Sequence, residues 1–265
     1  MSTFEGEAQL PSYDALCDAH QPPRLSPEAR RLFWSLDGPL DSAVYIMASQ
    51  RDPNSLEPYF QDQTWHPFSQ APLTEPKVSS ITVIVDELNQ WDEVWLDRHR
   101  DHTDPDYVDE TDPDTQWGDL PDYDPASDED GPKHLLKCCG SQRPRGKAVN
   151  VVVRPAHGPF VMIHDYLSTL HPLLLGSRAD ILNAMGDLME SELPAETKLM
   201  VDYIAPNHLF ICEQGDWVTE VSRPPNPLLE LMAASGPAAS GSMEAGGVGN
   251  ATVGAVVVAE PSGLV

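Results

Sequence analysis

The acidic stretch from Asp97 to Asp130 limits the possible folds of this chain more than any other feature. Fourteen of its residues are Asp or Glu, and only Arg98 and Arg100 oppose them. Four prolines also interrupt it. Like charges at this density repel one another, and proline breaks regular secondary structure. We therefore expect residues 97–130 to form a disordered acidic insertion.

Apolar runs lie on both sides of this insertion. Ile81 to Asp86 and Val149 to Val153 are rich in β-branched residues, a composition that predicts strands. A basic segment at 133–147 separates the acidic stretch from the second run. We expect the two strands to belong to one sheet, so that the acidic stretch interrupts a domain and does not link two domains.

Helices are predicted on either side of this sheet in the sequence. Ser26, Pro27 and Glu28 form a helix start, because Ser caps, Pro fits the first turn and Glu suits the positive end of the helix dipole. Apolar residues at helical spacing predict two further helices at 165–175 and 177–189. Within the first of these, Pro172 should kink or divide the helix.

A hairpin with strands at 198–204 and 209–213 is also predicted. Strands and helices are segregated along the chain, which favours an α+β fold: a small, mostly antiparallel sheet with two helices packed on one face. The chain then divides into four parts: a disordered arm at 1–24, a helix with a Pro-rich irregular segment at 25–77, the interrupted α+β domain at 78–220, and a disordered tail at 221–265.

The net charge of −26 restricts the partners of this chain. So acidic a surface repels nucleic-acid phosphates and anionic lipid, which leaves basic proteins, cations or only water as partners. The alternative to a binding role is that the acidity serves solubility. No apolar run is long enough to span a membrane. The first residues lack the basic start and apolar core of a signal peptide, and the four cysteines show no disulfide spacing. We therefore expect a reducing compartment, the cytoplasm or the nucleus.

Three histidines recur every seven residues, at His157, His164 and His171. If one helix held both His164 and His171, they would share a face two turns apart. With Asp165 they are candidates for zinc binding or acid–base catalysis, since imidazole changes charge near neutral pH. The spacing is too long for the i, i+4 pair of a helical zinc site. The alternative is that these histidines are surface or capping residues.

Cys138 and Cys139 are adjacent, with His134 nearby. We expect that neighbouring cysteines do not easily share one tetrahedral zinc, and no second cysteine pair exists. Basic residues around them would lower the thiol pKa, which makes the two cysteines candidates for a reactive or lipid-modified pair. The alternative is an inert pair at the edge of a domain. The acidic stretch lacks the calcium-loop pattern of an EF-hand. No cofactor and no specific metal site are therefore predicted.

Two copies of a Leu-Pro-x-Tyr pattern lie in segments expected to be disordered. The first is carried by Leu10, Pro11 and Tyr13, and the second is carried by Leu120, Pro121 and Tyr123. Both resemble the short extended ligands of WW domains, which grip a proline segment in an aromatic groove. The alternative is chance, because such a pattern arises easily in a chain with 26 prolines.

The block PFVMIHDYLSTLHPLLL at 159–175, followed by ILNAMG and LPAETKLMVDY, resembles a segment of uncharacterised fungal proteins. The resemblance covers about a third of the chain and implies a fungal origin. It implies no activity, cofactor or partner.

Known catalytic and nucleotide-binding motifs are missing from the sequence. The leading hypothesis is a non-enzymatic intracellular protein that acts through protein contacts, with a basic or WW-domain partner. The alternative is an enzyme or accessory protein of a fungal biosynthetic pathway that uses His164 or His171. A third hypothesis is an electrostatic switch, in which the basic segment at 133–147 folds back on the acidic stretch.

Overall fold

A computed structural model of the chain describes residues 10–102, 112–120, 133–144 and 150–223. The chain divides into two units, at 1–223 and 224–265, and the second unit lies outside the described residues. The main apolar core of the first unit draws on most of its length, from Tyr13 to Ile211. The segment 25–77 therefore belongs to the same core as the α+β region that follows it.

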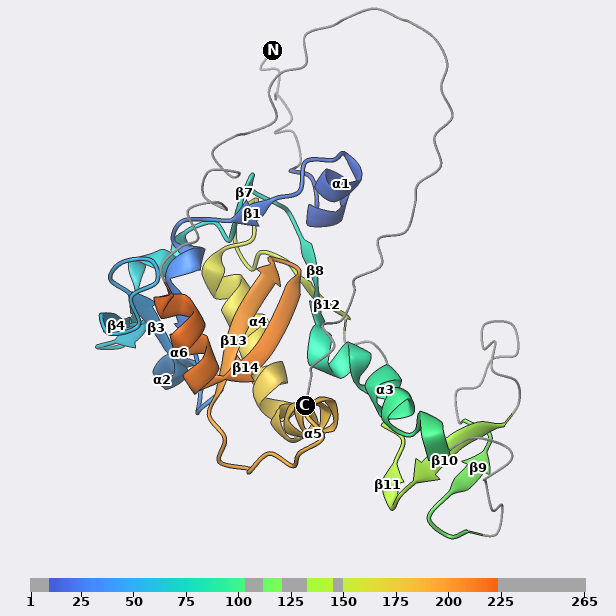
Figure 1. Cartoon of the computed structure of the whole chain (residues 1–265). Coiled ribbons are helices and arrows are strands. Elements are labelled where there is room, and N and C mark those ends of the chain that lie inside the picture. The colour runs from blue at the N-terminus through green and yellow to red at the C-terminus, as the bar shows by residue number, and fades with distance from the viewer. Residues whose placement is uncertain (1–9, 103–111, 121–132, 145–149, 224–265) are drawn as a thin grey trace, which may run out of the picture. The chain divides into compact units, whose positions relative to one another are not determined.

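The central sheet has four strands in the order β12, β8, β14, β13 (Figure 1). These strands are β8 (Ile81–Val85), β12 (Asn150–Val153), β13 (Leu199–Ala205) and β14 (His208–Glu213). The pairs β12–β8 and β13–β14 are antiparallel, whereas β14 and β8 are parallel. The register pairs Ile84 with Asn150. The two apolar runs that flank the acidic stretch therefore form one sheet, as predicted.

Three helices accompany this sheet: α3 (Asp86–Arg98), α4 (Ile163–Gly176) and α5 (Arg178–Leu188). The α+β class is confirmed. Leu167, Leu170 and Leu174 of α4 are fully buried, as helical spacing predicts. Pro172 lies inside α4 without ending it. It is tolerated because Ser168, whose carbonyl loses its intrahelical donor, faces solvent, as Pro172 itself does.

The helix expected from Ser26 is wrong. The Ser26 hydroxyl does accept a hydrogen bond from the Ala29 amide, at 3.1 Å, but the cap starts only a single 3₁₀ turn, η1 (Ala29–Arg31). Strand β2 (Leu32–Trp34) follows, and all three of its residues are buried. It pairs with β3 (Val44–Met47), which pairs in turn with β4 (Leu56–Pro58). Consecutive burial on both faces suits a strand better than a one-sided helix.

The disordered arm predicted at 1–24 is wrong for residues 10–24. They contain α1 (Tyr13–Asp18) and the start of β1 (Arg24–Leu25), which pairs with β7 (Thr74–Glu75). Helix α6 (Gln214–Ser222) was not predicted, and the rest of the predicted tail, from residue 224, is not described. The remaining short elements of the N-terminal region are α2 (Leu40–Ala43), β5 (Phe60–Gln61), β6 (Thr64–Trp65) and η2 (Pro67–Gln70).

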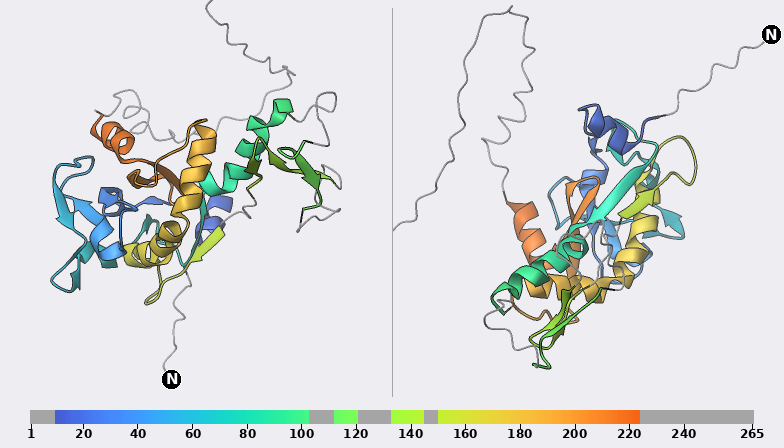
Figure 2. Two further views of the ribbon diagram at one scale, coloured as in Figure 1. Left: turned by 90° about the horizontal axis from the view of Figure 1, so that it is seen from below. Right: turned by 90° about the vertical axis from the view of Figure 1, so that its right-hand side faces the viewer.

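A three-stranded sheet separate from β2–β3–β4 lies at the C-terminal end of α3 (Figures 1 and 2). Its order is β11 (Ser141–Gln142), β10 (His134–Cys138), β9 (Gln116–Gly118), and the turn η3 (Arg100–His102) follows α3. The prediction of disorder across 97–130 is thus wrong for 97–102 and for β9. Residues 103–111 and 121–132 lie outside the described part of the chain. We refer to α3, η3 and this sheet as the α3 arm.

None of the described helices has the length and hydropathy needed to cross a membrane.

Candidate functional site

His171, the first catalytic candidate, is a buried structural residue. The Trp34 indole N–H donates a hydrogen bond to His171 Nδ1 at 2.9 Å, and His171 Nε2 lies 2.9 Å from the Gly38 carbonyl oxygen. This pattern fits the neutral ring with its proton on Nε2. Burial lowers the pKa of His171, which also favours that neutral form. Both ring nitrogens are occupied, so neither is available to a substrate.

His164 and Asp165 do not form a site with His171. The Tyr59 hydroxyl lies 3.2 Å from His164 Nδ1, and the His164 ring packs on Trp65 with ring centroids 4.5 Å apart. The Asp165 carboxylate accepts a hydrogen bond from the Met162 amide at 2.9 Å, so it caps the start of α4. A second amide, that of Ala156, donates to the same carboxylate at 3.0 Å.

The third histidine of the series, His157, is exposed on the segment before α4 and belongs to neither of these contacts. The seven-residue spacing therefore brings no two of the three histidines to a common site.

The first Leu-Pro-x-Tyr pattern is part of the folded domain. Tyr13 is buried, and its amide donates to the Ser80 carbonyl at 2.8 Å. A WW domain would have to pull this tyrosine out of the core to bind it. In the second pattern Leu120 is also buried, while Pro121 and Tyr123 lie outside the described residues. The WW-ligand hypothesis loses its support at the first position.

Cys138 and Cys139 meet two histidines that the sequence did not single out. His99 ends α3 and His102 ends η3, and the four donor atoms lie within 4.8 Å of one another. Among the described residues this set holds the donors best placed for a metal ion. His134 is not part of it. The sequence predicted a lowered thiol pKa for both cysteines. At Cys138 burial instead raises the thiol pKa.

Adjacent cysteines converge because the chain turns between them. In a regular strand consecutive side chains point to opposite faces. Cys138 ends β10, and Cys139 adopts a left-handed backbone conformation with φ of 49° in the turn to β11. The turn breaks the alternation, and the two sulfur atoms lie 3.8 Å apart. The two neighbouring sulfur atoms therefore lie on the same side of the chain at this position.

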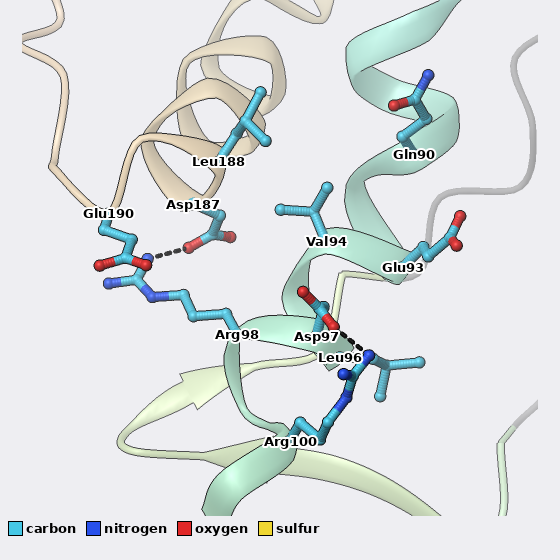
Figure 3. A pocket seen from close by; sticks show the side chains of 10 residues that line it. All are labelled: Gln90, Glu93, Val94, Leu96, Asp97, Arg98, Arg100, Asp187, Leu188 and Glu190. Atoms are coloured by element: carbon cyan, nitrogen blue, oxygen red, sulfur yellow. Dashed lines mark hydrogen bonds and ion pairs between the residues drawn. The ribbon is translucent and has the colours of Figure 1, made fainter. Parts of the chain in front are cut away.

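A groove of about 610 Å³ lies between α3 and the C-terminal end of α5 (Figure 3). We call it the α3–α5 groove. Arg98 reaches from α3 to the Asp187 carboxylate at 2.9 Å, and Arg100 turns back to form an ion pair with Asp97. The Trp91 indole N–H also donates to Asp187, at 2.7 Å. These contacts fix α3 against α5 and so define the walls of the groove.

The lining of the groove combines apolar and acidic side chains. Val94, Leu96 and Leu188 supply the apolar part. Leu188 is 62% exposed, and the next residue, Met189, is 46% exposed. Four carboxylates and two guanidinium groups line the groove, which leaves it with a net charge of −2. Exposed large apolar side chains rimmed by charge mark binding surfaces more often than catalytic centres.

No protein-family model, curated protein or solved structure matches this chain. The resemblance to fungal proteins stays a prediction.

Proposed function

We propose that this chain is a non-enzymatic binding protein that holds a basic, amphipathic helix of a partner protein in the α3–α5 groove. The observation that carries the proposal is the exposure of Leu188, which lines the groove among acidic side chains and is followed in the chain by the exposed Met189. A helix of this kind would lay its apolar face on these two side chains and direct its Lys or Arg residues toward the carboxylates.

The charges of the groove favour a basic partner. Arg98 and Arg100 are each paired with a carboxylate of the same groove. The side chains of Glu93 and Glu190 make no ion pair with another described residue, so they are open to a cation from outside. The net charge of −26 adds a long-range attraction that speeds the approach of a basic partner.

The compartment in this proposal is the cytoplasm or the nucleus. All four cysteines are free, which suits a reducing environment. The enzyme hypothesis has less support, because both ring nitrogens of His171 are engaged inside the protein.

A direct test uses a fluorescent model peptide of about 18 residues. Its Leu residues recur at helical spacing so that they form one face, and Lys residues occupy the other face. Anisotropy should report binding to the full chain, and the double variant Leu188→Ser, Met189→Ser should weaken it. We expect a loss of about tenfold or more, since losing the burial of one Leu costs on the order of 1.5 kcal/mol.

Two controls separate the groove from general charge attraction. A scrambled peptide of the same composition keeps the charge but loses the apolar face, so it should bind weakly and equally to all variants. The variant Val152→Ser removes an apolar side chain of 43% exposure from β12, away from the groove, and should bind like the wild type. Equal binding of both peptides, or an unchanged affinity in the double variant, would refute the proposal.

A further inference from the structure

Four metal-binding side chains converge at the far end of the α3 arm. His99 and His102 come from the end of α3 and from η3, and Cys138 and Cys139 come from the end of β10 and the turn after it. The pairs are more than thirty residues apart in sequence, and the fold of the arm brings them together. Two of the four, His99 and Cys138, are buried, whereas His102 and Cys139 are exposed.

The distances within this cluster match a tetrahedral site. Zinc binds sulfur at about 2.3 Å and imidazole nitrogen at about 2.0–2.1 Å, so tetrahedral angles place two sulfur ligands about 3.8 Å apart and sulfur and nitrogen about 3.6 Å apart. The two sulfur atoms are 3.8 Å apart, and Cys138 Sγ lies 3.8 Å from His102 Nδ1. Cys139 Sγ is closer to that nitrogen, at 2.9 Å. Metal entry would lengthen this one contact by about 0.7 Å, a movement open to an exposed side chain.

A second observation points to a missing partner at the same place. His99 is only 5% exposed, and its Nδ1 is buried without a hydrogen bond to any described residue. Its ring packs on Trp95, with centroids 4.4 Å apart. A buried polar atom without a partner is costly and is rare in folded proteins. A metal ion within reach of this nitrogen would remove that cost.

The apolar core of the arm is small, and polar contacts such as the ion pair between Arg143 and Asp92 add to it. Its buried apolar cluster consists of Trp95, Leu135 and Cys138, with Leu96 packed beside them. So small a core supplies little stability, and small units of this kind commonly rely on a metal or disulfides. The cysteines here are free. A metal bound by α3, η3 and β10 would cross-link the three-stranded sheet to the helix.

We propose that His99, His102, Cys138 and Cys139 bind one zinc ion, which fixes the small sheet to the end of α3. Two thiolates and two imidazoles are a donor set typical of structural zinc, while calcium and magnesium require oxygen ligands. On binding, the sulfur of each cysteine replaces its proton with a bond to zinc, and two protons pass to the solvent. All four positions are filled by protein, so the centre is structural and leaves no place for substrate.

Solvent reaches the cluster through a second cavity, of about 680 Å³, whose lining includes His99 and Cys139. Zinc entry therefore requires no unfolding of the arm. The same opening exposes the bound ion to chelators, so we expect zinc to exchange faster here than from a fully enclosed site.

The test begins with the full chain, stripped of metal under reducing conditions and then supplied with zinc. Elemental analysis after desalting should find about one zinc per chain. Cobalt in place of zinc should give the intense visible bands of a tetrahedral ion and a near-ultraviolet thiolate-to-metal transition. The variants Cys139→Ser and His102→Gln should weaken zinc binding by more than about a hundredfold in competition with a coloured chelator, since even the outer partners of zinc ligands contribute ten- to a hundredfold.

Matched controls remove the same residue types elsewhere. Cys17→Ser and His157→Gln lie outside the cluster and should bind zinc like the wild type. The two ligand variants change exposed side chains, so their metal-free circular dichroism should equal that of the metal-free wild type. The proposal fails if the wild type binds no stoichiometric zinc, if cobalt shows no thiolate transition, or if the ligand variants bind zinc as tightly as the controls. Copper or iron in place of zinc would overturn the choice of metal.

Discussion

Glu87 offers a quantitative test of the electrostatics of the central sheet. It lies at the start of α3, where one carboxylate oxygen accepts a hydrogen bond from the Ile211 amide at 2.7 Å and the other is buried without a partner. Burial raises its pKa from 4.5 to about 7, against the opposing effect of that hydrogen bond. The folded protein therefore favours the protonated carboxyl more than the unfolded chain does.

Because the pKa of Glu87 is higher in the folded protein than in the unfolded chain, its ionisation destabilises the fold. Below pH 4.5 the carboxyl is protonated in both states and costs nothing. As the pH rises to about 7, the unfolded chain ionises first and the folded state loses stability, by about 3 kcal/mol once ionisation is complete. The variant Glu87→Gln keeps the acceptor for Ile211 and cannot ionise. Its advantage over the wild type should be near zero at pH 4.5 and reach about 3 kcal/mol at pH 8.

Urea unfolding between pH 4.5 and 8 measures this difference. A chelator keeps the cysteine–histidine cluster empty throughout, because metal binding has its own pH dependence. Glu93→Gln is the control, since it removes the same charge from an exposed position of the same helix. A difference between Glu87→Gln and wild type that stays constant with pH, or that follows the control, would refute the reasoning.

Two further predictions concern the structural roles of two side chains of α4. His171→Leu leaves the buried Trp34 indole N–H and the Gly38 carbonyl without partners, and should lower the free energy of unfolding by about 2–4 kcal/mol. Peptide binding in the groove should not change, and a loss of binding at unchanged stability would contradict the structural role. Asp165→Ala removes the acceptor of the Met162 amide and should lower the free energy of unfolding by about 1–2 kcal/mol. Urea unfolding measures this loss, and an unchanged urea midpoint would show that Asp165 does not stabilise the start of α4.

Periodic segments were predicted well because local pattern and burial agree in them. The strand at 81–86 and the helices at 165–175 and 177–189 were placed within a few residues of β8, α4 and α5. The helix prediction from Ser26 was wrong although the Ser26 cap is real, because the apolar residues that follow are consecutive and form a strand. A helix and a strand buried on both faces look alike over so short a run.

The cysteine–histidine cluster had only a weak signal in the sequence. His99 and His102 stand three residues apart, a spacing that places side chains on one side of a helix end. Their partners Cys138 and Cys139 follow the acidic stretch, whose composition indicated disorder. The end of α3, the turn η3 and the pairing of β9 with β10 show that parts of this stretch are folded.

The pairing of Ile84 with Asn150 has a consequence for how this chain tolerates change. It brings the two strands that flank segment 86–149 side by side in the central sheet, as in proteins that carry one domain inserted into another. Doubling the length of such a closed loop costs only about 0.6 kcal/mol. The ladder between β8 and β12 can therefore keep its register when residues are gained or lost between α3 and β12, while α3 itself stays fixed by its contacts with α5.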